Sequence, residues 1–195
     1  MKFYRAAALA LGLSLALTAC GSGPNSGSGS GDSAGSDSTA DNSLLTIAIQ
    51  DEIEGCDIQQ IGWENIVHGL IYEPLVVFSE DLSEIQPAFA ESYTVAEDGS
   101  YIEFVLPKDA KFSNGDVCDA AAVKASEERF LEISEYAGDL DAVSDIEVVD
   151  EQTIRYNLSG PAPYMWASLT STYGGINDVA VADTMEADAF NRCPV

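Results

Sequence analysis

The chain has 195 residues and a formal net charge of −25, because 33 Asp and Glu residues outnumber 8 Lys and Arg residues. This acidity excludes nucleic acid as a partner, since binding to phosphates needs a basic face, and it excludes a purely electrostatic attachment to anionic lipid. The single His excludes a His-rich metal site, and we expect neither a metal ion nor a cofactor.

The first 20 residues have the pattern of an export signal. Lys2 and Arg5 precede an apolar stretch over residues 6–17, which spans about 18 Å as a helix and is too short for a bilayer core of ~30 Å. Residues 17–20 (LTAC) resemble the lipobox of bacterial lipoproteins. The resemblance implies that the signal is cut before Cys20 and that Cys20 carries the lipid that anchors the protein to a bilayer. An ordinary signal peptide that ends near a Cys is the alternative.

Residues 21–43 are rich in Gly and Ser and contain no apolar face. Ordering such a segment would cost backbone entropy without any burial in return. We therefore predict a disordered tether over residues 21–43, and a folded part that begins near Leu44 and continues to Val195.

The folded part is predicted to mix short strands and helices. Strands are expected where apolar or alternating runs occur, at residues 44–49, 75–78, 101–106, 146–149 and 153–158. Helices are expected where apolar residues recur at helical spacing, at residues 63–72, 120–133 and 164–169. Asp119 is the expected N-cap of the second helix. Turn signals lie at residues 97–99 and 113–116.

Several short segments, none specific alone, occur in a definite order between residues 44 and 164. They are DIQQ at 57–60, IYEPLV at 71–76, PAFAESY at 87–93 with EDG at 97–99, FVL at 104–106, KFSNG at 111–115, a helix with Val123, Ser126, Glu128 and Arg129, VVD at 148–150 with Thr153, and LSGPAPY at 158–164. Together they resemble the bacterial extracellular solute-binding proteins of family 5, the oligopeptide, dipeptide and nickel group of ABC importers. Pro107 and Cys118 depart from the pattern, which usually has a basic and an apolar residue there.

The resemblance implies a mixed α+β lobe, of the α/β class, with the class II fold of periplasmic binding proteins. Members of the family are several times longer and have two lobes, and their chains continue past a segment like residues 191–195. The chain is therefore expected to be an N-terminal fragment with the first lobe only, and to bind no peptide tightly by itself.

The function implied by the resemblance is transport, with no enzymatic activity. The protein would capture peptides or a similar small solute at the outer face of the cell membrane, as in a Gram-positive bacterium. It would pass the solute to an ABC permease that a partner ATPase drives. A lipoprotein sensor with the same fold and a non-functional gene fragment are the alternatives.

The candidate ligand-cleft residues are Asp57, Ile58, Gln59 and Gln60. Loop residues on a rigid scaffold frequently carry binding functions. In the alternative interpretation, these four residues form a turn that caps the helix after it.

Other candidate residues have two interpretations each. Trp63 and Trp166 could stack on a ligand or belong to the core, and His68 could bind nickel or haem or be packed among apolar neighbours. An exported protein is compatible with a disulfide, and Cys56, Cys118 and Cys193 allow three single pairings. The sequence does not decide among these pairings, although Cys56 is the favoured participant.

Overall fold

The computed structural model describes residues 45–50, 52–192 and 194–195. The predicted signal, Cys20, the predicted tether and Cys193 lie outside the described residues. The chain divides into two compact units, residues 1–47 and 48–195, and residues 45–47 of the first unit form neither helix nor strand. No helix in the described ranges has the length and apolar character needed to cross a membrane.

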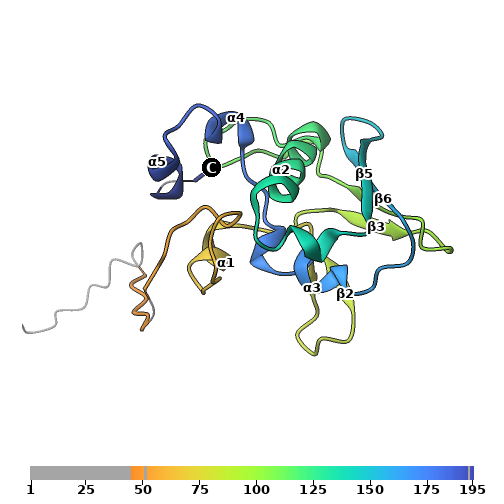
Figure 1. The fold of residues 1–195 in the computed structure, drawn as a ribbon, viewed down its shortest axis with the longest axis horizontal. Helices are drawn as coiled ribbons and strands as arrows, with labels where there is room; N and C mark the ends of the chain where they lie inside the picture. The colour runs from red at the N-terminus through yellow and green to blue at the C-terminus, as the bar shows by residue number, and fades with distance from the viewer. Residues whose placement is uncertain (1–44, 51, 193) are drawn as a thin grey trace, which may run out of the picture. The chain divides into compact units, whose positions relative to one another are not determined.

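The second unit contains an antiparallel four-stranded sheet, here called the central sheet, with strand order β3-β4-β6-β5; Figure 1 shows β3, β5 and β6 on the right-hand side of the view. The strands are β3 (Ser92–Val95), β4 (Tyr101–Val105), β5 (Val143–Val148) and β6 (Thr153–Leu158). Alternate residues of β4 and β6 are buried, and Ile102 pairs with Tyr156 while Phe104 pairs with Ile154. The strands predicted at residues 146–149 and 153–158 are confirmed, and they form the antiparallel pair β5–β6.

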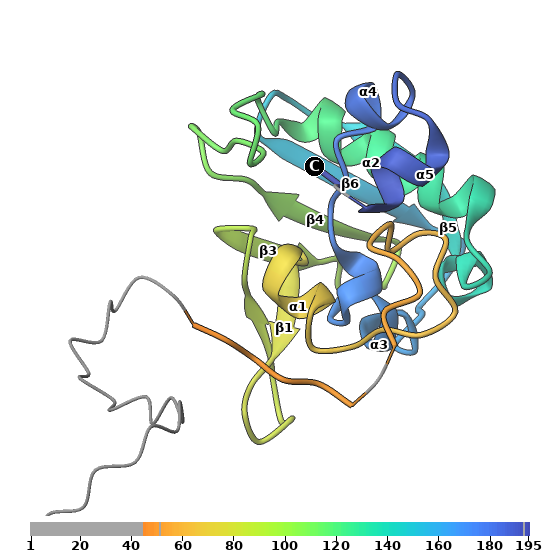
Figure 2. The ribbon, with the colours of Figure 1, turned by 90° about the vertical axis from the view of Figure 1, so that its left-hand side faces the viewer.

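The longest helix, α2 (Ala120–Ile133), covers one face of this sheet against β5 and β6 (Figure 2). Its bounds are those predicted from the sequence. Asp119 caps it, since the carboxylate accepts a hydrogen bond of 2.9 Å from the backbone N–H of Ala122. Val123 and Phe130 point into the core together with the polar residue Glu127.

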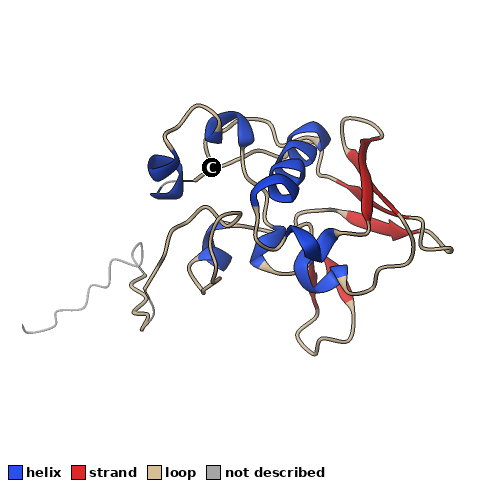
Figure 3. Ribbon diagram, viewed as in Figure 1, coloured by secondary structure: helices blue, strands red, loops and turns tan. Residues whose placement is uncertain are grey.

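Short elements complete the unit (Figure 3). Strands β1 (Val76–Phe78) and β2 (Ile85–Pro87) form a separate antiparallel pair. The helices are α1 (His68–Ile71), α3 (Met165–Leu169), α4 (Val179–Ala182) and α5 (Ala187–Arg192), with 3₁₀ helices η1 (Ala137–Leu140) and η2 (Thr172–Gly174). The mixture of sheet and helices confirms the predicted mixed α+β class.

Two predicted elements were wrong. Residues 45–49 form no strand, and Leu45 and Ile47 are largely exposed, because no strand in the described part pairs with them. The helix predicted over residues 63–72 is limited to α1. Side-chain hydrogen bonds around Asn65 stabilise a turn before it, since Asn65 Oδ1 accepts the N–H of Val67.

The core has two parts. The larger part lies between the sheet, α2 and α3, and Phe104 packs edge-on against Tyr156 at 5.3 Å between ring centroids. The smaller part consists of Ile58, Ile61 and Tyr72, against which Tyr173 packs. Part of the predicted cleft loop therefore belongs to a core.

Candidate functional site

The predicted ligand-cleft loop, residues 57–60, is mostly buried. Its first three residues expose at most 1 % of their surface, whereas Gln60 is exposed. The guanidinium of Arg129 donates to the two carboxylate oxygens of Asp57 at 3.1 and 2.6 Å, and the Gln60 amide donates to the second oxygen at 2.7 Å. Burial raises the pKa of Asp57, but the hydrogen bonds from Arg129 and Gln60 outweigh burial and hold this pKa below its ordinary value.

Gln59 extends this network to two distant segments. Its side-chain amide donates to the backbone oxygen of Ser126 at 2.9 Å and to the Ser126 hydroxyl at 3.1 Å. The same hydroxyl accepts the backbone N–H of Asn177 at 3.0 Å. The loop, α2 and the segment before α4 are thereby joined inside the unit. Contact between the loop and a ligand stays a prediction, with Gln60 as the exposed side chain.

His68 is packed inside the unit. Its side chain is fully buried, and both ring nitrogens take part in hydrogen bonds. Nδ1 accepts the backbone N–H of Asn65 at 3.0 Å, so Nε2 carries the proton and donates to the backbone oxygen of Gly55 at 2.7 Å. Neither nitrogen is available to a metal ion in this arrangement, which supports the packed interpretation of His68.

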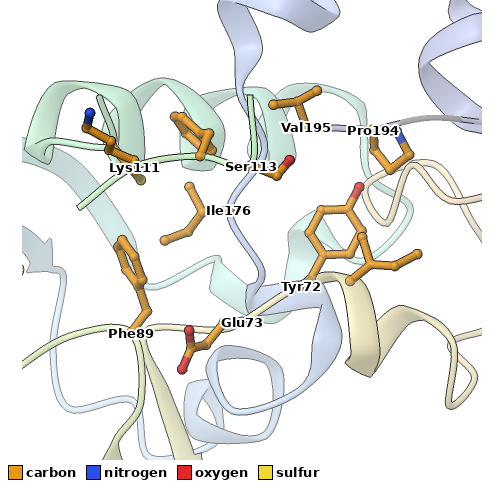
Figure 4. A pocket seen from close by; sticks show the side chains of 11 residues that line it. Tyr72, Glu73, Phe89, Lys111, Ser113, Ile176, Pro194 and Val195 are labelled. Atoms are coloured by element: carbon orange, nitrogen blue, oxygen red, sulfur yellow. The ribbon is translucent and has the colours of Figure 1, made fainter. Parts of the chain in front are cut away.

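One hollow, with a volume of about 190 Å³, lies where α1, the 111–113 segment and the end of the chain meet. Figure 4 shows Ile176 between Phe89 and Tyr72. The lining residues are Ile71, Tyr72, Glu73, Phe89, Lys111, Phe112, Ser113, Cys118, Ile176, Pro194 and Val195. Apolar and polar groups share the walls, with the cation of Lys111 and the carboxylate of Glu73 among them, so the hollow suits an apolar group with a polar end.

A second hollow, of about 370 Å³, is lined by Glu52, Trp63, Glu64 and Asn65. The Trp63 side chain is 76 % exposed, so the face of its indole is open to contact from solvent. The position of Glu64 is fixed by a hydrogen bond, because its carboxylate accepts the backbone N–H of Thr172 at 3.1 Å. An aromatic face beside carboxylates can hold an apolar group and a cation together.

An aromatic pair that the sequence does not predict lies near this second hollow. The rings of Tyr136 and Tyr173 lie 4.5 Å apart between centroids, and the Tyr136 hydroxyl donates to the backbone oxygen of Gly62 at 2.6 Å. Gly62 directly precedes Trp63, so this bond helps to position the exposed indole. Tyr136 caps the start of η1 and Tyr173 lies in η2, and no local sequence pattern signals their contact.

Cys118 belongs to the larger core, and Trp166 packs against that core. Trp166 is half-buried and packs edge-on against Tyr93 at 5.5 Å between ring centroids. Cys118 is a buried free thiol. Burial, followed by the charges of Asp119 and Asp178, raises the pKa of this thiol to about 12. In the ranges that the structure describes, no group of three or more His, Cys, Asp or Glu residues is arranged to hold a metal ion.

Comparison with protein families places more than half of the chain in one of them. Residues 84–192 match the family model described as bacterial extracellular solute-binding proteins, family 5 Middle. The matched range contains all four strands of the central sheet and α2.

Individual proteins match over much of this chain but over little of their own length. The chain is 29 % identical over 126 residues to a probable D,D-dipeptide-binding periplasmic protein of Escherichia coli, covering 60 % of this chain and 24 % of the relative. It is 28 % identical over 149 residues to di/tripeptide-binding protein 2 of Pseudomonas aeruginosa, and this match covers 64 % of this chain and 28 % of the relative. The crystal structure of NikZ from Campylobacter jejuni in complex with Ni(L-His) matches with a TM-score of 0.64 at 20 % identity. This match covers 73 % of this chain and 29 % of the NikZ chain. The chain thus spans about a quarter of the length of the curated relatives that it matches.

Proposed function

Because the chain belongs to family 5 of the bacterial extracellular solute-binding proteins, we propose that it captures short peptides, or a similar small solute, for an ABC importer. The observation that carries this proposal is the family match over the sheet and α2. The names of two curated relatives mention dipeptides or di- and tripeptides, which supports peptides as the solute class, and a third relative is named as a nickel-binding protein. An ABC permease and its ATPase would be the partners that receive the solute.

The chain would supply one side of the binding cleft. The hollow around Trp63 supports this role, because it presents an exposed aromatic face next to Glu52 and Glu64. A peptide with an apolar side chain and an ammonium group matches that chemistry. Binding to one side alone should be weak, with a Kd of about 1 mM and a binding free energy of about −4 kcal/mol.

Saturation-transfer difference NMR with lysyl-phenylalanine tests the proposal on the 195-residue chain. We expect a transfer signal on the phenyl protons, and we expect Trp63→Ala to weaken binding about tenfold, since exposed aromatic anchors dominate such contacts. The matched control is Leu82→Ala, which removes a side chain that is 72 % exposed on the β1–β2 connection. Absence of signal with the unaltered chain, or equal losses in the two variants, would contradict the proposal.

We also propose that Cys20 is acylated and holds the protein at the outer face of the cell membrane through the tether. Replacing Cys20 by Ser should release the protein from the membrane fraction, because the acyl chains would supply the membrane affinity at roughly 0.8 kcal/mol per buried CH₂. A detergent phase-partition assay measures this change, with Cys118→Ser as the control that keeps the anchor. Partitioning of the Cys20→Ser protein into the detergent phase would refute acylation at this residue.

A further inference from the structure

The single histidine of the chain connects the two segments that line the second hollow. One segment, residues 52–55, supplies Glu52, and the other, residues 63–65, supplies the remaining lining residues Trp63, Glu64 and Asn65. The Nε2 of His68 donates to the backbone oxygen of Gly55 at 2.7 Å, and its Nδ1 accepts the backbone N–H of Asn65 at 3.0 Å. One imidazole ring therefore holds both segments of the hollow.

The surroundings of this ring are fixed. The backbone N–H of Cys56, the residue after the 52–55 segment, donates to the backbone oxygen of Asn191 in α5 at 2.7 Å. The backbone oxygen of Cys56 accepts the Tyr72 hydroxyl at 2.8 Å. The His68 side chain is fully buried, so the ring cannot turn without breaking both of its hydrogen bonds. Its position and the position of the 63–65 segment are thereby linked.

The two hydrogen bonds of His68 require one protonation state. The N–H of Asn65 is a donor, so Nδ1 must offer its lone pair, and the oxygen of Gly55 is an acceptor, so Nε2 must carry the proton. Histidine is the side chain that ordinarily titrates between pH 5 and pH 8. A proton added at Nδ1 would turn this atom into a second donor facing the N–H of Asn65. That N–H would lose its acceptor, whereas the bond to Gly55 would remain.

We propose that His68 is a positioning residue for the hollow at Trp63, and that protonation of its Nδ1 releases the 63–65 segment and weakens solute binding. This role rests on the proposed function, because it adds a response to pH at the same site. The 63–65 segment carries three of the four lining residues, so its release changes most of the contact surface. The site would hold its solute near neutral pH and release it in mildly acidic surroundings.

The charged and titratable groups around His68 lie on residues 52–57, on the 63–65 segment, at the end of α1 and on α5, which contacts Cys56. They are Glu52, Glu54, Cys56, Asp57, Glu64, Tyr72, Glu73, Asp188 and Arg192. Asp57 is paired with Arg129 and its pKa is lowered, while burial raises the pKa of Tyr72, so both keep their charge state between pH 5.5 and pH 8. Glu127 in the core has its pKa raised to about 7 and needs a control.

NMR and fluorescence test the link between the ring and the hollow without any ligand. Because the sequence contains one histidine, long-range ¹H–¹⁵N spectra report directly whether Nδ1 of His68 carries a proton. The Trp166→Phe background leaves Trp63 as the one tryptophan, and its fluorescence anisotropy reports the mobility of the indole. We expect the anisotropy to fall with the same midpoint as Nδ1 gains its proton between pH 8 and pH 5.5. A constant anisotropy during protonation, or a ring that stays neutral down to pH 5.5, would overturn the proposal.

Binding of Nα-acetyl-lysyl-phenylalanine amide tests the consequence for a solute, since its single charge, the Lys ammonium, is constant over this pH range. Saturation-transfer titrations should give a Kd about fivefold higher at pH 5.5 than at pH 8, which is the effect of one hydrogen bond. His68→Gln cannot gain the proton and should remove this difference. Glu127→Gln removes the titrating group in the core and should keep it. A difference that persists in His68→Gln, or one that disappears in Glu127→Gln, would overturn the role of His68.

The two measurements distinguish this proposal from the proposed function. If the unaltered chain gives no transfer signal at either pH, the proposed function fails, and the anisotropy of Trp63 still decides whether His68 positions the hollow. Binding that is equal at both pH values leaves the proposed function intact and overturns the role of His68. If His68→Gln does not fold, the ring and anisotropy measurements in the His68-containing chain decide by themselves.

Discussion

Replacing Arg129 by Met should lower the free energy of unfolding by about 3–5 kcal/mol, because it leaves the Asp57 carboxylate buried without a cation. The side chain of Asp57 is 1 % exposed and that of Arg129 is 15 % exposed, so water screens the pair little. Asp57 also depends on Arg129 for two of its hydrogen bonds. Urea unfolding followed by circular dichroism gives the free energy directly.

Two further variants control this measurement. Arg155→Met makes the same substitution in an ion pair with Glu103 whose side chains are 30 % and 24 % exposed, and it should cost much less because solvent screens the pair. Asp57→Asn combined with Arg129→Met should be less destabilising than Arg129→Met alone, since no charge is left buried. Equal losses for Arg129→Met and Arg155→Met would show that burial of the charge is not the cause.

The second large effect is a dependence of stability on pH that comes from Glu127. This carboxyl faces the core from α2 and is 4 % exposed. Burial raises its pKa from 4.5 to about 7, and the nearby Tyr156 lowers it by less. The Tyr156 hydroxyl has no hydrogen-bond partner of normal geometry within the described residues. Tyr156 therefore offsets only a small part of the rise that burial causes in the pKa of Glu127.

The direction of the effect follows from proton binding. Between about pH 4.5 and pH 7 the unfolded chain has released the Glu127 proton while the folded chain still holds it, so stability falls as pH rises. The contribution of Glu127 to the free energy of unfolding is largest below about pH 4.5. About 3 kcal/mol of this free energy is lost by pH 7–8, at 1.36 kcal/mol per unit of the pKa difference. Asp57 acts in the opposite direction, because its lowered pKa makes stability fall in acid.

Glu127→Gln separates this contribution from those of the other carboxyls. Its free energy of unfolding should vary less between pH 5 and pH 8 than that of the unaltered chain, as measured by urea unfolding at a series of pH values. Glu128→Gln is the matched control, because Glu128 is the next residue of the same helix and its side chain is 59 % exposed. A pH profile that is the same for Glu127→Gln and the unaltered protein would rule out Glu127 as the source.

The sequence predicted the local part of the fold well. Helix α2 and the strands of the β5–β6 hairpin were predicted correctly, because the N-cap residue and the periodic spacing of apolar residues that indicate them are local features of the sequence. The helix predicted over residues 63–72 was too long because Trp63 and Ile66, which extend its apolar pattern toward the N-terminus, are exposed in the structure and no core stabilises a helix there. The periodic spacing of apolar residues does not show whether another element will cover the apolar face of the helix.

The candidate site was harder to predict for a related reason. The sequence identified the loop around Asp57 as special, but its partners Arg129 and Asn177 lie 72 and 120 positions away. Local patterns do not encode such contacts. The resemblance to the family indicated the loop without indicating which way its side chains point, and the structure turns three of the four inward.

The order of the strands also determines when the unit can assemble. β4 pairs with β6 rather than with β5, so the central ladder joins residue 101 to residue 157. A chain that emerges with its N-terminus first cannot complete this ladder until β6 has appeared, and closing so long a loop costs entropy before any contact repays it. Helix α2 and the β5–β6 hairpin need only local contacts, so they should form early and provide the surface onto which β4 docks.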